Sequence, residues 1–178
     1  ARAEAAAGDR LTVRTVRSWH LQPGLIDLLA ARTVAALQSL GAAATGAEVL
    51  FTAHSLPERI VADGDPYPEQ LRETAAAVAA LAGIERWRTA WQSAGRTPDP
   101  WLGPDITEVI RGLPAEGRTG VVVCPAGFVS DHLEVLYDVD VQAAEVAAAV
   151  GLPLVRTASL NDDPAFIAVL AAVVEAAA

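Results

Sequence analysis

Short runs of apolar residues alternate along this chain with longer segments in which apolar residues recur every three or four positions. Residues 49–53 (VLFTA) and 120–124 (GVVVC) are unbroken apolar runs, which are typical of strands buried on both faces of a parallel sheet. Residues 88–92 and 154–157 form runs of similar length, and residues 11–17 (LTVRTVR) alternate apolar and polar side chains, as half-buried strands do. The pattern predicts five strands.

Helices are predicted between these strands, and proline or aspartate marks where several of them begin. Pro23 fits the first turn of a helix, where its missing N–H costs nothing. Asp65 and Asp163 are each followed by proline, which predicts an N-cap and a first-turn proline. The predicted helices cover residues 23–40, 66–81, 104–111, 131–150 and 164–178. This alternation indicates βαβ units with right-handed crossovers, and therefore a three-layer α/β fold, Rossmann-like, with helices on both faces of a mainly parallel sheet.

Length and composition indicate a folded domain with an affinity for cations. We expect one α/β domain over residues 1–178, of which 52% are apolar and 20% charged, with no polar low-complexity tract. The net charge is −9 and no basic residues cluster, which argues against nucleic acid as a partner.

The single cysteine, Cys124, excludes an internal disulfide and a metal site built from several thiolates. No signal peptide opens the chain, and the longest apolar run, residues 165–174, is too short for a transmembrane segment, so we expect a soluble cytoplasmic protein. The sequence starts at Ala1 and contains no methionine, which is consistent with a piece of a longer protein.

Ligands of parallel α/β sheets bind beyond the carboxyl ends of the strands. The corresponding loops cover residues 18–22, 54–65, 93–103 and 125–130, and His20, His54 and His132 lie in or just after them. His54 directly follows the strand 49–53, where an imidazole can bond to the backbone, accept a proton or bind a first-row metal. His20 and His132 are weaker candidates, since nothing in their spacing pairs them with an acid.

Glu134, Asp138 and Gln142 are spaced four residues apart, which would place them in one line along a helix. One interpretation is structural: Asp131 would be the N-cap and Glu134 would complete a capping box. The other is functional. Neighbouring parallel strands end at the same edge, so His54 and Glu134 would meet there as a metal site or as a pair of proton acceptors.

Other candidates are less specific. Trp91 and Trp101 flank the loop 92–100 and either line a pocket for a flat ligand or belong to the core. Cys124 ends a buried strand and is expected to act as a small hydrophobic residue. The sequence contains no Gly-rich phosphate loop, nucleophile elbow or HExxH motif.

Four blocks of the sequence resemble segments of the ferrochelatases, which insert ferrous iron into a porphyrin in haem synthesis. The blocks are FTAHSLPERI (51–60), GDPYPEQL (64–71), WQSAGRTPDPWLGPDI (91–106) and VVVCPAGFVSDHLEVLYD (121–138). The resemblance implies two similar chelatase-like α/β halves that hold the porphyrin in the cleft between them, and this chain corresponds to the C-terminal half. The implied site residues are His54 and Glu134 for catalysis, His54, Glu134 and Asp138 for metal, and Trp91, Ser93, Arg96 and Thr97 for porphyrin.

The chain also departs from the family's pattern. Gln142 stands where many relatives carry a third acid, and one cysteine cannot hold the iron–sulfur cluster of some relatives, so no cofactor beyond the substrate Fe(II) is expected. The first half of the family has no counterpart, and the expected partners are therefore that half, or a second copy, together with porphyrin and iron.

The resemblance implies insertion of Fe(II) into coproporphyrin III or protoporphyrin IX. The former is favoured because the abundance of alanine and the absence of lysine indicate a GC-rich bacterial genome. Two alternatives stay open. One is a short, stand-alone chelatase that acts as a homodimer on another tetrapyrrole. The other is a non-catalytic module that binds metal or porphyrin and passes it on.

Overall fold

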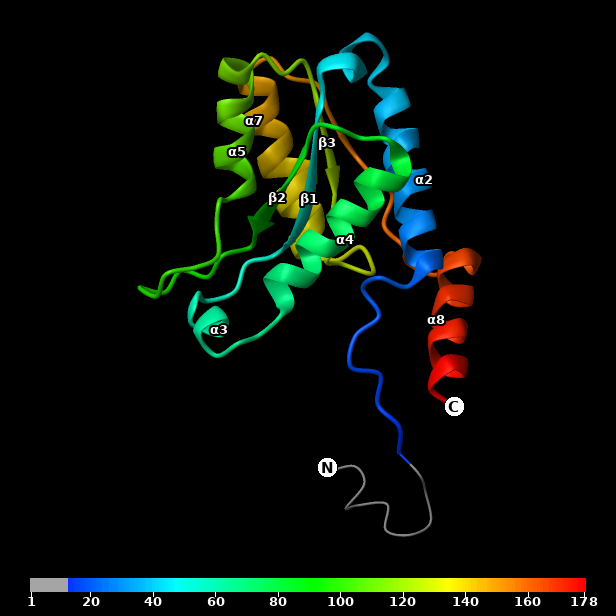
Figure 1. Ribbon diagram of the computed structural model, residues 1–178. Helices are drawn as coiled ribbons and strands as arrows, with labels where there is room; N and C mark the ends of the chain where they lie inside the picture. The colour runs from blue at the N-terminus through cyan, green and yellow to red at the C-terminus, as the bar shows by residue number, and fades with distance from the viewer. Residues whose placement is uncertain (1–12) are drawn as a thin grey trace.

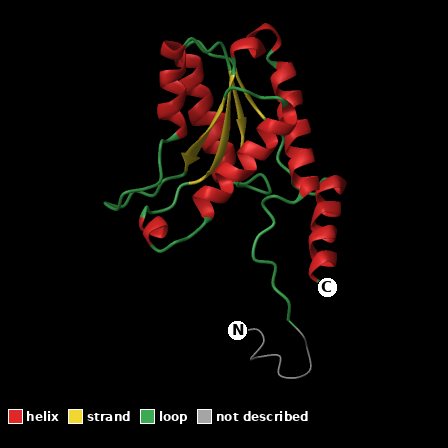
Figure 2. Ribbon diagram, viewed as in Figure 1, coloured by secondary structure: helices red, strands yellow, loops and turns green. Residues whose placement is uncertain are grey.

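The computed structural model describes residues 13–178, in which four parallel strands form one sheet between two layers of helices (Figures 1 and 2). The strands lie in the order β2-β1-β3-β4. Their bounds are Glu48–His54 for β1, Trp87–Gln92 for β2, Val121–Cys124 for β3 and Leu154–Arg156 for β4. The predicted α/β fold, with a parallel sheet and helices on both faces, is confirmed.

The first helical layer consists of α2 (Pro23–Ser39) and α4 (Tyr67–Ala82), with α8 (Pro164–Ala177) against α2. Val49 and Phe51 of β1 point into this layer, where they join Ala75 and Val78 of α4 in one buried cluster. A strand that alternates its side chains between two covered faces must be apolar throughout, which explains the unbroken run in β1.

The second layer consists of α5 (Ile106–Gly112), α6 (Leu133–Tyr137), the π-helical segment η4 (Asp138–Ala143) and α7 (Ala144–Ala149). Leu50 of β1 and Val123 of β3 point into it and pack with Ile110 and Val139. In Figure 1, α5 and α7 lie on one side of the strands, and α2 and α4 on the other. The short elements α3 (Arg59–Ala62), η2 (Gly41–Gly46) and η3 (Leu113–Glu116) lie in the connections.

The strand predicted at residues 11–17 is wrong for the part that the structure describes. Residues 13–19 form no regular structure, and residues 14–17 are exposed, while residues 11 and 12 lie outside the described range. An alternating pattern favours a strand only where another strand lies beside it to receive its hydrogen bonds and side chains.

Helix starts follow the predicted caps closely. Asp163 accepts a hydrogen bond from the Ala165 N–H at 2.8 Å, which confirms it as the N-cap of α8. Asp65 accepts one from Tyr67 at 2.9 Å, but it is not the N-cap as predicted: Pro66 occupies that position, and α4 starts one residue later than predicted. The helix predicted to start at Pro104 starts instead at Ile106, because Asp105 caps it.

The helix predicted for residues 131–150 differs most from expectation. It begins at Leu133 and changes to π-helical hydrogen bonding over η4 before α7 continues it. The capping box is also wrong: His132 occupies the N-cap position, and the Asp131 carboxylate accepts hydrogen bonds from Ser159 and Asn161 instead. Single π-helical turns within a helix are frequent at functional sites.

The strand order fixes where a ligand has access to the sheet. The chain passes from β1 to β2 on one side and then crosses back to β3 on the other side of β1. The carboxyl ends of β1 and β3 therefore flank the point at which the order reverses, which is the usual binding crevice of such sheets. Within residues 13–178, no helix combines the length and apolar character needed to cross a membrane.

Candidate active site

His54 is the last residue of β1, and three hydrogen bonds fix it and the residue that follows it. The Tyr67 hydroxyl donates to the His54 carbonyl at 3.1 Å. The next residue, Ser55, donates its N–H to the Gln92 carbonyl at 2.7 Å and its hydroxyl to the Leu102 carbonyl at 2.7 Å. Burial raises the pKa of Tyr67, so this hydroxyl stays protonated and able to donate.

The imidazole of His54 is fixed in one tautomer by its neighbour. Its Nδ1 lies 2.5 Å from the Ser55 carbonyl oxygen, which can only accept, so Nδ1 carries the proton. In the neutral ring Nε2 then presents a lone pair, and this atom lies 3.5 Å from Oε2 of Glu134. The His54 side chain is 33% exposed and that of Glu134 is 54% exposed, so solvent species reach the space between them.

Glu134 reaches this position because the loop after β3 passes close to the end of β1. Gly127 makes the approach possible, since a Cβ at this position would lie 2.4 Å from the Cβ of Ala53. The Gly127 N–H donates to the Thr52 carbonyl at 3.0 Å, and this bond fixes the loop that leads into α6. The predicted meeting of His54 and Glu134 at adjacent strand ends is thereby confirmed as geometry.

Asp138 is the first residue of η4, and Ser93 just after β2 donates its hydroxyl to it. Ser93 adopts a left-handed conformation with φ of 61°, which costs a non-glycine residue roughly 1–2 kcal/mol. The strained turn directs the hydroxyl to the carboxylate. Asp138 is therefore held beside the end of β2, the strand next to the one that carries His54.

A polar pocket of about 320 Å³ continues from Asp138. Gln142 also lines this pocket, so Asp138 and Gln142 share one face of the helix although the turn between them is π-helical. Gln92 lies fully buried in its wall, with Oε1 bonded to Thr52 at 2.9 Å. The lining residues are Gln92, Ser93, Asp105, Ile106, Thr107, Arg111, Asp138, Gln142, Glu145 and Val146.

Comparison with known proteins gives this geometry a context. The family model of ferrochelatase matches residues 1–178. The chain belongs to the ferrochelatase family. It is 47% identical over 163 residues to a ferrochelatase of Deinococcus radiodurans, a match that covers 90% of this chain and 52% of that protein.

Two further relatives are named coproporphyrin III ferrochelatases. The one from a Geobacillus strain is 44% identical over 176 residues, with 98% of this chain and 57% of the relative covered. The one from Anoxybacillus flavithermus is 46% identical over 178 residues, with 98% and 56% covered. The chain thus spans about half the length of the curated relatives it matches.

The residues proposed to shape the porphyrin pocket lie in different surroundings. Trp91 is only 5% exposed, and its ring packs against Tyr67 at 5.7 Å, so it supports the site from within the core. Arg96 is in the exposed loop after β2. Thr97 receives the indole N–H of Trp101 at 3.1 Å, and Trp101 packs over Gly95, where a Cβ would come within 2.3 Å of the ring. The porphyrin-binding roles of these residues stay predictions.

The other two histidines have partners of their own. His20 lies 2.7 Å from Glu73 and 2.6 Å from the Ser18 hydroxyl, so both of its nitrogens are engaged. Nothing in the spacing of His20 and Glu73 along the chain predicted this pair. The His132 ring packs on Phe128 with centroids 5.1 Å apart.

The candidate site has few possible metal ligands. Among residues 13–178, the side chains of His, Cys, Asp and Glu nowhere gather in threes as a ready metal cage. Cys124 is fully buried, and burial raises the pKa of its thiol, in keeping with the predicted role of a small hydrophobic residue. Sequence reasoning missed Tyr67, whose contact with His54 comes from a different element.

Proposed function

We propose that this chain supplies the metal-binding half of a ferrochelatase site that inserts Fe(II) into coproporphyrin III or protoporphyrin IX. One observation carries the proposal: the lone pair of His54 Nε2 faces the Glu134 carboxylate across 3.5 Å, at the point where the strand order reverses.

Two electron-rich atoms at that distance repel each other unless a proton or a cation lies between them. Nitrogen and oxygen ligands at about 2.1 Å from one tetrahedral metal lie about 3.4 Å apart, close to the observed separation. The pair therefore has the spacing to hold a first-row divalent ion without rearrangement. Two ligands of this kind position an ion and still release it, whereas a closed cage of thiolates would retain it.

Metallation also requires the removal of protons. When Fe(II) enters the macrocycle, two pyrrole N–H protons leave, so the net charge of the product is unchanged. A neutral imidazole and a carboxylate are both proton acceptors, and His54 and Glu134 become free to act as such when the metal departs. Asp138, held by Ser93 at the rim of the polar pocket, supplies a further acceptor along the same edge.

The macrocycle must be bent before its nitrogens become accessible, and bending needs contacts on both of its faces. This chain forms one wall, which can contact one face of the macrocycle, and it spans about half the length of its relatives. We therefore include in the proposal a second wall, either the remaining half of a family-length protein or a second copy. The names of two relatives favour coproporphyrin III as the substrate. We include a cytoplasmic location in the proposal.

The test measures iron insertion under anaerobic conditions by the change in visible absorbance of coproporphyrin III, with protoporphyrin IX in parallel. The full protein, meaning this chain together with whichever second wall completes the site, is compared with its His54→Ala variant. His20→Ala is the matched control, because His20 also faces a glutamate but has both ring nitrogens engaged.

We expect His54→Ala to lower the rate by a factor of about 10²–10⁴, the range for loss of a positioned acid–base group, and His20→Ala to retain Fe(II) binding. Equal rates for His54→Ala and wild type would refute the assignment. Fe(II) binding that depends on His54, with no turnover on either porphyrin in the full protein, would favour the non-catalytic module instead.

A further inference from the structure

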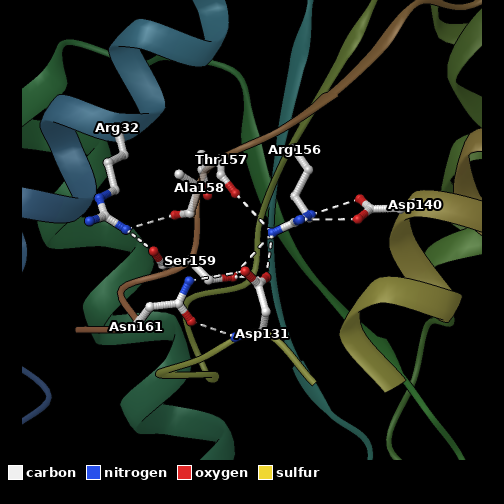
Figure 3. Close-up of polar contacts among 8 residues, drawn as sticks. All are labelled: Arg32, Asp131, Asp140, Arg156, Thr157, Ala158, Ser159 and Asn161. Atoms are coloured by element: carbon white, nitrogen blue, oxygen red, sulfur yellow. Dashed lines mark hydrogen bonds and ion pairs between the residues drawn. The ribbon is translucent and has the colours of Figure 1, made fainter. Parts of the chain in front are cut away.

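Arg156 is the last residue of β4, and its guanidinium joins two carboxylates, those of Asp131 and Asp140 (Figure 3). Residues 131–140 also carry Glu134 and Asp138 and are called the acid-bearing segment below. Nε and Nη2 donate to the two oxygens of Asp140 at 2.7 and 3.0 Å. Nη1 lies 3.1 Å from Oδ1 of Asp131. The arginine side chain is only 16% exposed, so its charge is largely removed from water and depends on these partners.

Asp131 is tied to the same region by three further contacts. Its carboxylate accepts from Ser159 at 2.6 Å and from Asn161 at 3.0 Å, and its backbone N–H donates to Asn161 at 2.8 Å. The hydrogen bonds from Asn161 and Ser159, with the nearby Arg156, lower the pKa of Asp131. The carboxylate is therefore ionised, and the start of α6 is fixed to the loop after β4.

That loop is itself anchored to the body of the protein. Arg32 of α2 donates to the Ala158 carbonyl at 2.9 Å and to the Ser159 carbonyl (Figure 3), and it also pairs with Asp163 at 2.5 Å. A continuous set of charge-assisted contacts thus runs from α2 through the loop after β4 to both ends of the acid-bearing segment.

The two anchor points, Asp131 and Asp140, enclose Glu134 and Asp138 in the sequence. Neither of the enclosed acids contacts Arg156 in this network. Glu134 faces His54, and Asp138 accepts from Ser93. The segment is therefore held by Arg156 at its ends, while its two central acids are left to point at the sheet edge.

We propose that Arg156 is a positioning residue for metal binding: by joining Asp131 to Asp140, it holds α6 and η4 in the path that places Glu134 opposite His54. This inference rests on the function proposed above. Asp140 lies within the π-helical segment, where the regular α-helical bonds are interrupted, so the side-chain contact replaces part of the rigidity that a continuous helix would have.

The role requires arginine and not only a positive charge. A planar guanidinium engages two carboxylates at once, whereas the ammonium of lysine is a single compact charge. Arg156→Lys therefore keeps the charge and loses the bridge. The chain offers a matched control in Arg88, which joins Glu48 at 2.8 Å and Glu116 at 2.5 Å at the opposite end of the sheet.

The experiment compares Arg156→Lys with Arg88→Lys in the full protein. Thermal unfolding reports stability, Co(II) titration followed by visible absorbance reports metal affinity, and steady-state assays give KM separately for Fe(II) and for the porphyrin. We expect Arg156→Lys to weaken Co(II) binding and to raise KM for Fe(II) by about 10-fold or more, with KM for the porphyrin within about twofold of wild type. Arg88→Lys should change stability alone.

The inference is overturned if Arg156→Lys and Arg88→Lys affect Co(II) affinity and the KM for Fe(II) equally at similar stability. Asp140→Asn removes the bridge with a milder effect on folding, because Asp140 is 39% exposed, and it must reproduce the metal defect if the inference holds. Failure of the proposed function is detected separately: the wild-type protein would then not bind metal through His54. That result would overturn this inference as well.

Discussion

His20 and His54 each face a glutamate, and the two pairs differ in what they leave unsatisfied. His20 Nε2 lies 2.7 Å from Glu73 and its Nδ1 lies 2.6 Å from the Ser18 hydroxyl, so both ring nitrogens have a hydrogen-bond partner. His54 has one nitrogen bonded to the Ser55 carbonyl and the other 3.5 Å from Glu134. The first pair is at hydrogen-bond distance, and the second is at the distance of two ligands on one ion.

The difference shows why residue types alone do not identify a site. Both pairs combine the same side chains, and both are partly exposed. The His54 pair is set apart by its backbone, which fixes the tautomer, and by its place at the reversal of strand order. A site that accepts and releases an ion needs groups that are held in place and still lack a partner.

The largest expected difference between the pairs follows from removing the carboxylate charge. Glu134→Gln should lower iron insertion by about 10²–10⁴, since the amide can neither accept a proton nor bind Fe(II) comparably. Glu73→Gln should leave metal affinity unchanged and cost about 1 kcal/mol of stability, the typical value of one hydrogen bond. Anaerobic rates and urea unfolding of both variants check this. Comparable losses of Fe(II) affinity in the two would contradict the comparison.

Lowering the pH should weaken the contacts of Asp131 that fix the start of α6, the helix that carries Glu134. The pKa of Asp131 in the folded state lies below its ordinary value of 3.8, so between the two values the unfolded chain binds more protons. The contribution of the Asp131 carboxylate to stability is therefore complete at a pH above 3.8. It is lost as the pH falls through the lower pKa that the group has in the folded state. Asp131→Asn should be less stable than wild type at pH 7, with the difference shrinking towards pH 2–3 in urea unfolding. A difference that is constant with pH would exclude this linkage.

The smallest expected effect concerns the strained turn beside the site. Ser93→Ala and Ser93→Gly both remove the hydroxyl that Asp138 accepts, but only glycine relieves the left-handed conformation. Ser93→Gly should therefore be about 1 kcal/mol more stable than Ser93→Ala by urea unfolding. Metal affinity should fall less than in Glu134→Gln, because Ser93 contacts Asp138 and not the His54 pair. Equal stability of the two variants would mean that the turn carries no strain.

Much of the fold followed from local pattern. The unbroken apolar runs at β1 and β3 predicted strands buried on both faces, and the cap at Asp163 predicted a helix start, since each depends on neighbours in sequence. The strand predicted at residues 11–17 failed over its described part because a strand depends on a pairing partner that sequence pattern does not reveal. Asp131 failed as a cap for a similar reason: Ser159 and Asn161, close to it only in the fold, bind its carboxylate.

The sequence by itself determined the α/β class, the membership of the ferrochelatase family and the approach of His54 to Glu134. They depend on periodicity, on sequence blocks that resemble the family and on the rule that parallel strands end at one edge. Only the tertiary structure decided the tautomer of His54, the contact of Ser93 with Asp138, and the bridge from Arg156 to Asp131 and Asp140. These features arise from contacts between residues far apart in sequence, and their distances are fixed only when the layers pack.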